Sequence, residues 1–595
     1  MPVTPTYPGI YIQEAPSASH TIISAPTNIA VFIGYTHPLK TNPVNFGVPV
    51  EIFGFSDYQR QFGGFVRSAA FANAYDSAKM PGAFGDMAQA INQFFLNGGT
   101  DAFVVSVNQA SASSALAKAL PQPPVLGSPP LSPPSPPGLP AQVLDIGGVV
   151  FTQLEVTDEI FAMSVVIRPS PPTSPSTYGT ADIVLTYGPI VPNAATPTID
   201  TSPATTVETY RRVSLDPASS TYILKAMAAS SLVRASLSTP APIVFTGTTG
   251  GQPLFFPQLL SAKTQIFSAA DFTAMLQEDT PLDKLPIFNL MVIPGVSDNG
   301  PSGDSDTGGV SVLAAAIAFC ERKRAFLIVD PPVRDTADGT YAFTTILSDG
   351  SKFTPNPPHK IADSASDNSF PRSKNAALYF PYLLSPDPIT GGSVGLVSGL
   401  PSEIPPAATV AGIYAATDLA RGVWKAPAGF QATASNVNGV AARGKMTDNR
   451  HGTLNPIGVN CLRDFPNVPT IVFGARTLAT TYDQQWTYVP VRRMALFLEQ
   501  TLLANLKWVL FEPNAQPLWS AITMSINAFM LGLFKQGAFQ GTTPSQAFSV
   551  RCDSQTTTQA DIDSGIVNIV VGFAPLKPAE FVIITIAQLA GQAAA

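Results

Sequence analysis

Apolar residues at strand spacing lie at both ends of this 595-residue chain. Near the start, PGIYIQEA predicts a short strand at residues 9–14 between prolines. Near the end, residues 580–589 are rich in Val, Ile, Thr and Phe, and both alternating sets are largely apolar, so both faces of this predicted strand require burial. Terminal residues of most domains are loosely held. The pattern therefore raises the question of whether these strands complete the chain's own sheet or pair elsewhere.

Hydrophobic periodicity between the ends predicts two strand–helix–strand units. Their elements are expected at residues 27–36, 87–97 and 101–107, and at 285–295, 308–322 and 325–332. Alternation of strands and helices in this order is typical of an α/β domain. Further along, two amphipathic helices are predicted at 491–511 and 518–534, with Pro513 and Gly537 as their stop signals.

The sequence between these two units differs from both of them in composition. Residues 121–140 contain ten prolines, which favours a semi-rigid polyproline spacer. The following stretch is rich in Ser, Thr and Pro and includes strand-like runs such as FAMSVVI and ADIVLTY. We expect residues 111–264 to form a β-rich inserted domain, and the alternative is a disordered low-complexity loop.

Charged residues make up 12% of the chain and hydrophobic residues 45%, whereas soluble domains usually have about 25% charged residues. No uninterrupted apolar run reaches the roughly 18 residues of a membrane span, so direct membrane insertion is not expected. The start has no basic and apolar signal pattern, which predicts assembly in the cytoplasm without a signal peptide. The low charge favours burial in large permanent subunit interfaces, and an ordinary enzyme with a large core is the alternative.

The inventory of reactive side chains is small. Three cysteines lie far apart without CxxC spacing, four histidines are dispersed, and the net charge is −7. This pattern predicts no disulfide framework, no metal site, no cofactor and no nucleic-acid partner.

Four local motifs were tested for chemistry. GGSVG places Ser393 in a G-x-S-x-G pattern, but loop-like text on both sides favours a flexible turn over a nucleophile elbow. GVAARGKM resembles a phosphate-binding loop, yet Met446 stands where Ser or Thr is required. His451, Cys461 and Asp464 allow a Cys–His pair, although turn residues around them favour a structural loop.

The fourth motif, CDSQTTTQADIDSG, holds Asp553, Asp561 and Asp563 without the spacing of a calcium loop, which predicts a solvated loop. No catalytic constellation emerges from the four motifs, so no enzyme activity is expected.

Several long motifs occur in a family-specific order in the C-terminal third. They are SKNAALYFPYLL (373–384), PPAATVAGIYAATDLARGVWKAPAG (405–429), LNPIGVNCLRDF (454–465), FGARTL (473–478), VLFEPNAQPLW (509–519), GAFQGTTPSQAFSVRCD (537–553) and APLKPAEFVI (574–583). Together with the opening PGIYIQEAPSASHTIISAPTNIAVFIGYT, they strongly resemble the tail sheath proteins of contractile phage tails and contractile injection systems. The resemblance covers about 1–110 and 285–595, and Phe473 stands where the family often has tryptophan.

The resemblance implies an answer to the question of the terminal strands. In sheath proteins the terminal strands leave their own subunit and pair with strands in the C-terminal domains of neighbours, a form of β-augmentation. The alternative, that both strands complete their own subunit's sheet, remains open. The expected subunit-linking residues are Gly9, Ile10, Tyr11, Ile12, Gln13, Glu14, Phe581, Val582, Ile583, Ile584, Thr585 and Ile586.

The implied fold class is a multidomain α/β and α+β sheath core with mixed sheets flanked by helices, a β-rich inserted outer domain, and exchanged terminal strands. The expected domains are an N-terminal linking arm (1–26), an α/β core (27–110 plus 265–371), the outward-facing insertion (111–264), a C-terminal sheath domain (372–579) and a C-terminal linking arm (580–595).

The implied function is that of a structural subunit that polymerises into a helical sleeve around an inner tube and contracts to drive the tube through a target envelope. The expected partners are further copies of the chain, the inner tube protein, and baseplate and cap proteins of a phage tail or tail-like particle. Three alternatives remain: a sheath-like paralogue that forms a short ring or non-contractile sleeve, a serine hydrolase using Ser393, and a surface adhesin that binds through 111–264.

Overall fold

The computed structural model describes residues 21–37, 39–67, 84–107, 143–157, 161–172, 178–191, 198–201, 203–238, 243, 245, 251–257, 269–296, 309–331, 371–389, 403–440, 446–480, 482–581 and 583. The chain divides into two compact units. Unit 1 comprises Met1–Ala25, Arg421–Ala426 and Tyr488–Ala595, and unit 2 comprises Pro26–Ala420 and Pro427–Thr487. The expected C-terminal domain at 372–579 is therefore shared between both units.

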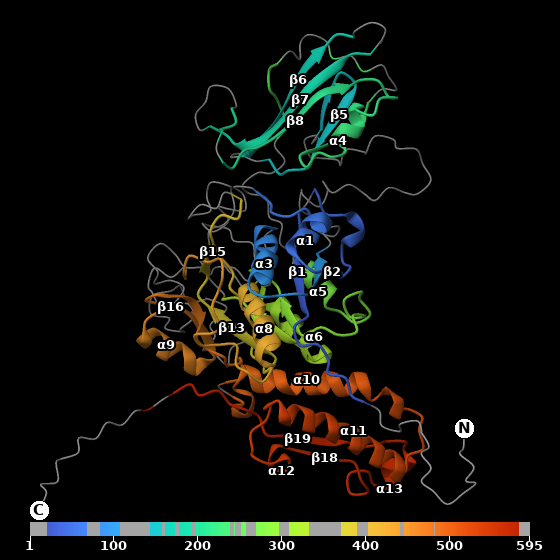
Figure 1. Ribbon diagram of the computed structural model, residues 1–595, viewed down its shortest axis with the longest axis vertical. Helices are drawn as coiled ribbons and strands as arrows, with labels where there is room; N and C mark the ends of the chain where they lie inside the picture. Colours follow the sequence, from blue (N-terminus) through green and yellow to red (C-terminus); the bar gives the residue numbers. More distant parts are fainter. Residues whose placement is uncertain are drawn as a thin grey trace, which may run out of the picture. The chain divides into compact units, whose positions relative to one another are not determined.

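Unit 2 is built on an eight-stranded sheet (Figure 1). Its six inner strands are parallel, in the order β3, β1, β11, β12, β13, β16. They span Ala102–Ser106, Ala30–Gly34, Leu290–Val292, Phe326–Val329, Ala376–Phe380 and Val459–Phe465. Antiparallel strands β2 (Val50–Ile52) and β17 (Val468–Val472) form the edges. Most inner strands are buried along their length, as expected for a parallel sheet covered on both faces.

Helices cover this sheet, and two of them, α3 and α6, are close to the positions predicted at 87–97 and 308–322. They are α1 (Phe55–Phe62), α3 (Phe84–Leu96), α5 (Ala269–Met275), α6 (Gly309–Lys323), α8 (Ala407–Arg421) and α9 (Asp448–Leu454). The rings of Phe94 on α3 and Phe32 on β1 meet edge to face with centroids 5.2 Å apart. Helices α3 and α8 approach closely at Gly412, where an added Cβ would lie 2.5 Å from the carbonyl oxygen of Phe94.

Unit 2 also contains a β-rich inserted part, drawn separately at the top of Figure 1. One sheet consists of β4 (Val143–Ile146), β5 (Val149–Gln153) and β9 (Val233–Leu237). The other consists of β10 (Leu254–Phe255), β6 (Phe161–Ser170), β7 (Thr180–Pro189) and β8 (Thr206–Ser214), and helix α4 spans Ile223–Met227. Both sheets contribute to one apolar core that includes Phe151, Phe161 and Ile223. The proline-rich stretch 121–140 lies outside the described residues.

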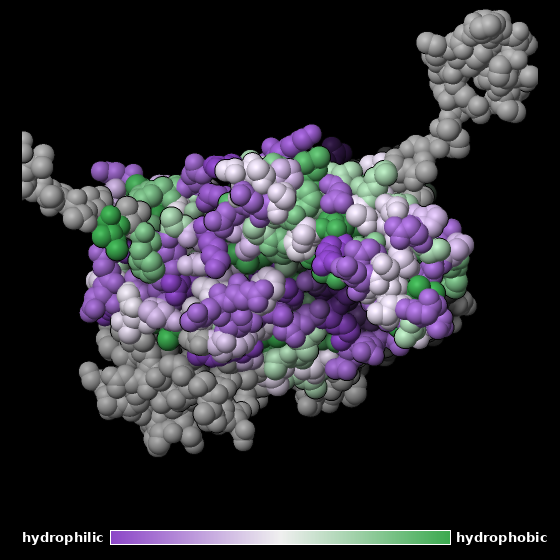
Figure 2. All heavy atoms as spheres, turned by 90° about the horizontal axis from the view of Figure 1, so that it is seen from below, coloured by the Kyte–Doolittle hydropathy of each residue, from purple (hydrophilic) through white to green (hydrophobic). Residues whose placement is uncertain are grey.

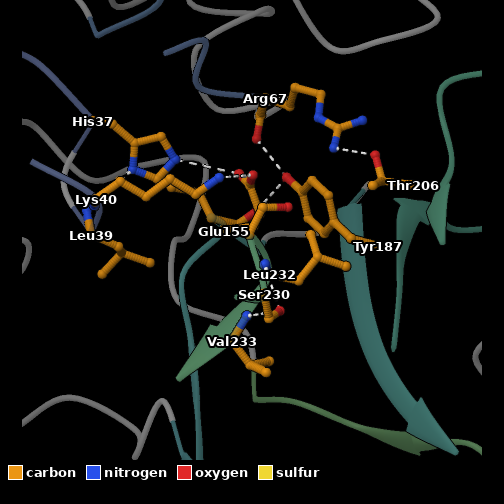
Figure 3. A network of polar contacts seen from close by, with 12 residues as sticks. His37, Leu39, Lys40, Arg67, Glu155, Tyr187, Thr206, Ser230, Leu232 and Val233 are labelled. Carbon is orange, nitrogen blue, oxygen red and sulfur yellow. Dashed lines mark hydrogen bonds and ion pairs between the residues drawn. The ribbon is translucent and has the colours of Figure 1, made fainter. Parts of the chain in front are cut away.

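A buried ionic cluster joins this inserted part to the N-terminal strand region (Figure 3). The carboxylate of Glu155 accepts hydrogen bonds from Lys40 Nζ and from His37 Nε2, the latter over 3.3 Å. His37 Nδ1 accepts the backbone N–H groups of Leu39 and Lys40, at 3.3 and 3.2 Å. His37 is therefore the neutral Nε2–H tautomer, because its other ring nitrogen is already an acceptor.

Arg67 and Tyr187 form the second half of the same junction (Figure 3). The guanidinium of Arg67 donates to Ala204 O (2.6 Å) and to Thr206 Oγ1 (2.9 Å), and it stacks over the ring of Tyr187 at 4.5 Å. The hydroxyl of Tyr187 lies 2.9 Å from Arg67 O and 2.7 Å from Val156 O, so its single proton is shared between these two acceptors. The polar groups of both parts, in side chains and main chain, thus provide hydrogen-bond partners for one another in a buried network.

Unit 1 pairs two long helices with a small sheet. Helix α10 spans Val489–Asn505 and α11 spans Gln516–Lys535, each with a proline in its first turn. Met494, Phe497, Trp519 and Ile522 belong to their shared core. By length and composition α11 could cross a membrane, but one of its faces packs in this core.

The predicted extension of the first helix to 511 is wrong. Helix α10 ends at Asn505 and is followed by a 3-10 turn at Lys507–Val509. Phe511 then has φ +68° and a fully exposed side chain. The helix itself ends eight residues before Pro513, where the backbone of Leu506 (φ −97°, ψ 10°) leaves the helical conformation, so proline is not its stop signal.

Candidate subunit interface

The candidate interface is a two-stranded antiparallel sheet in unit 1, formed by β18 (Phe548–Arg551) and β19 (Val570–Phe573). The register pairs Phe548 with Phe573 and Arg551 with Val570. Both strands alternate: the side chains of Phe548, Val550, Val571 and Phe573 pack against the helical core, whereas Ser549 and Arg551 are exposed. An isolated two-stranded hairpin is marginal in water, so this sheet depends on its packing against the helices.

Both outer edges of this sheet are open among the described residues, since neither β18 nor β19 pairs with a third strand there. Ala574 N donates to Ala547 O over 2.8 Å, which extends the register by one hydrogen-bonded pair. Bonded pairs alternate along an antiparallel ladder, so Gly572 and Val570 direct their backbone groups toward β18. Val571 and Phe573 consequently direct theirs outward, as does Val550 on β18, whereas the N–H of Phe548 already donates to Pro544 O.

The loop between the two strands is held by its own carboxylates. Asp553 accepts hydrogen bonds from the backbone of Gln555 and Thr556. Asp561 forms a capping box with Thr558 at the start of helix α13 (Gln559–Asp563), and these hydrogen bonds lower the pKa of Asp561. The predicted solvated loop therefore contains a short helix that sequence analysis missed, although the T-x-x-D pattern of the capping box was available as a signal.

The predicted linking residues are described only in part. Phe581 and Ile583 lie beyond β19 outside any strand, with 74% and 90% of their side-chain surfaces exposed. These are large apolar side chains that the described part of unit 1 leaves unburied. The linking residues outside the described part are Gly9, Ile10, Tyr11, Ile12, Gln13, Glu14, Val582, Ile584, Thr585 and Ile586.

Further apolar side chains are exposed on unit 1. They are Ile23, Leu503, Leu510, Phe511, Met524, Ile566 and Val570. The view from below shows hydrophobic residues at several separate places among hydrophilic ones, not one continuous apolar surface (Figure 2).

The motifs tested for catalysis do not come together as a reactive site within the described residues. Cys461 lies in the core of unit 2, and burial raises the pKa of its thiol, which disfavours the nucleophilic thiolate. Asp464 accepts from Thr470 Oγ1 (2.6 Å) and Val440 N (3.1 Å), and His451 packs against the ring of Phe473. Ser393 and residues 441–445 lie outside the described part.

The pairing of β18 with β19, which creates the open edges, was not predicted from the sequence. The signal was weak: Phe548–Arg551 alternates apolar and polar residues over only four positions, and Val570–Phe573 contains a glycine. Their pairing across the intervening loop is visible only in the fold.

Comparison with known proteins identifies what this unit resembles. Residues 481–588 match the family model of the phage tail sheath C-terminal domain. A putative prophage major tail sheath protein from Pseudomonas aeruginosa (strain UCBPP-PA14) is 24% identical over 278 residues, which cover 45% of this chain and 59% of that protein. The match thus spans less than two thirds of the relative.

Solved structures extend the likeness to nearly the whole chain. A chain of the anti-feeding prophage helical sheath in its contracted state has 19% identity and a TM-score of 0.52, with coverage of 98% of this chain and 100% of that one. A chain of the anti-feeding prophage baseplate structure has 20% identity and a TM-score of 0.50, with coverage of 98% and 99%. The resemblance to sheath proteins and the mixed α/β fold class predicted from sequence are confirmed.

Proposed function

We propose that this chain, which carries a phage tail sheath C-terminal domain and has the fold of contractile sheath proteins, is the subunit of a helical contractile sleeve. The observation that carries the proposal is the two-stranded sheet of unit 1, whose two outer edges are open among the described residues. Sheet edges of this kind usually invite aggregation and are blunted. Filling each edge with a donor strand from another subunit makes a specific contact instead.

The donors are the terminal arms. Residues 9–14 and 581–586 have strand-like sequences, and Phe581 and Ile583, which are exposed among the described residues, would gain burial against a neighbouring subunit. Donor and acceptor are different surfaces of one protein, so the contact is heterologous and propagates as a helix. Pro575 and Pro578 beside the C-terminal donor, and Pro8 and Pro16 beside the N-terminal one, suit semi-rigid tethers.

Contraction then consists of a rearrangement of rigid subunits that remain connected by their arms. The sleeve shortens and widens, and it drives an inner tube through a target envelope. The partners are further copies of the chain, the baseplate, the tube and the cap, in a phage tail or tail-like particle assembled in the cytoplasm. The matched domain and fold are those of structural proteins, which supports a mechanical rather than an enzymatic role.

Proline substitutions at the open edges test the proposal. Val571→Pro and Val550→Pro each remove an N–H that points away from the hairpin, so the subunit should fold while the affected edge loses a donor for the incoming strand. Negative-stain electron microscopy of the purified protein should show long hollow tubes for the wild type and only monomers or short oligomers for the proline variants. Val571→Thr, which retains the N–H, is the matched control. Full-length tubes from both proline variants would exclude strand addition at these edges.

A further inference from the structure

Residues 22–25, where the N-terminal arm joins unit 1, are the root of that arm and are held by side chains of helix α10. Asn505, the last residue of α10, accepts the backbone N–H of Ile23 at its Oδ1 over 3.0 Å. Its Nδ2 donates to the carbonyl oxygen of the same residue over 2.8 Å. The amide therefore takes both backbone groups of Ile23, as a neighbouring strand would, although 482 positions separate the two residues.

A second contact one turn earlier fixes the same segment. Thr501 Oγ1 accepts the backbone N–H of Ala25 over 3.1 Å, and the Thr501 side chain is fully buried. Asn505 Nδ2 also donates to Thr501 O over 2.8 Å, which orients the amide toward the arm. Ile22 packs against the core of unit 1. Residues 22–25 form no helix or strand, so these side chains account for their placement.

The C-terminal arm is held at the opposite end of the same helix. Tyr488 is the residue before α10, and its hydroxyl lies 3.4 Å from Glu580 Oε2 at the beginning of the arm. Helix α10 has 17 residues, which at 1.5 Å per residue gives a length of about 25 Å. The roots of both arms are therefore attached to the two ends of one rigid element.

We propose that Asn505 and Thr501 are positioning residues for strand donation, and that α10 sets the spacing between the two donor arms. The partner they serve is a second copy of this chain. A root fixed in place limits the conformations of the free arm and raises its effective concentration at the neighbour's sheet edge. This inference rests on the proposed function and adds to it the residues that aim the N-terminal arm.

The test compares the full-length double variant Asn505→Ala/Thr501→Val with Thr501→Ser and Asn527→Ala. Thr501→Ser keeps the acceptor oxygen, and Asn527 is a partly exposed asparagine of α11 in the same unit. The measurement is the critical concentration for polymer formation by sedimentation, together with amide hydrogen exchange at Ile23 and Ala25 in the soluble subunit. The double variant should exchange faster at both amides and require about tenfold more protein to polymerise, because three hydrogen bonds to the arm are lost. Both controls should match the wild type.

The outcomes separate the two proposals. Fast exchange at Ile23 and Ala25 in the wild type, or an unchanged critical concentration in the double variant, overturns the positioning role while the sheath function stands. A double variant with a lowered unfolding temperature that polymerises normally once folded also overturns it, since the contacts would then be structural only. A wild-type chain that never polymerises, alone or with the inner tube protein, overturns the proposed function, and the positioning role falls with it.

Discussion

Neutralising Glu155 should open the junction between the inserted part and the N-terminal strand region of unit 2. Burial alone raises the pKa of Glu155, but the charge of Lys40 and the hydrogen bond from His37 outweigh it and lower the pKa from 4.5 to about 2. Each pKa unit is worth about 1.4 kcal/mol, so the ionised carboxylate contributes about 3 kcal/mol at neutral pH. Glu155→Gln keeps the side-chain size and removes this charge.

Amide hydrogen exchange at pH 7 measures this loss of junction stability directly. The amides of Leu154 and Thr41 donate to Leu232 O and His37 O and so report on the junction. A loss of about 3 kcal/mol should accelerate their exchange roughly 100-fold. Asp145→Asn, which neutralises an exposed acid of β4, is the control and should leave both rates unchanged. Rates in Glu155→Gln within about threefold of the wild type would refute the argument.

The same cluster predicts a direction for the effect of pH. Burial lowers the pKa of His37 below 6.5, so the unfolded chain binds its proton more readily than the folded one. The stabilisation from neutral His37 is complete above about pH 6.5 and declines below it. That from Glu155 is complete above about pH 4.5 and is lost as the pH falls toward 2. The junction amides should therefore become less protected from hydrogen exchange as the pH falls from 7 to 5, after correction for intrinsic exchange rates. An increase in protection over this range would contradict the predicted direction.

Three further predictions concern the arms, the helix packing and the thiols. Removing residues 581–595 should abolish polymers and leave a folded subunit by circular dichroism; ordered tubes from the truncated chain would refute the linking role. Gly412→Ala should destabilise unit 2 by about 1–3 kcal/mol, because the new Cβ would lie 2.5 Å from Phe94 O. This net loss already includes a gain of about 1 kcal/mol in helix propensity. A raised unfolding temperature would show instead that α3 and α8 separate easily. Cys320 and Cys461 should resist thiol reagents in the native protein, since burial raises the pKa of both thiols; rapid labelling at pH 7 would indicate that the core of unit 2 opens.

Local periodicity was sufficient to predict several elements of the framework. The predicted strand at 27–36 contains β1 (Ala30–Gly34), the strand at 101–107 contains β3 (Ala102–Ser106), and the helix at 518–534 lies within α11 (Gln516–Lys535). These elements are long or strongly apolar, and their side chains repeat at the spacing of the final structure. The helix at 491–511 was extended too far because its apolar pattern continues through the 3-10 turn at Lys507–Val509, which only the structure reveals.

By itself, then, the sequence determined the order and type of the elements with strong periodicity, the sheath resemblance, and the strand-like, apolar pattern of the two terminal arms. Only the tertiary structure decided which groups meet: Glu155 with His37 across 118 positions, and Ile23 with Asn505 across 482. It also decided that β18 and β19 form a two-stranded sheet with outward-facing backbone groups. The physical reason is that a hydrophobic repeat records which face of an element is buried, whereas pairing of polar groups depends on the long-range path of the chain, which no local pattern encodes.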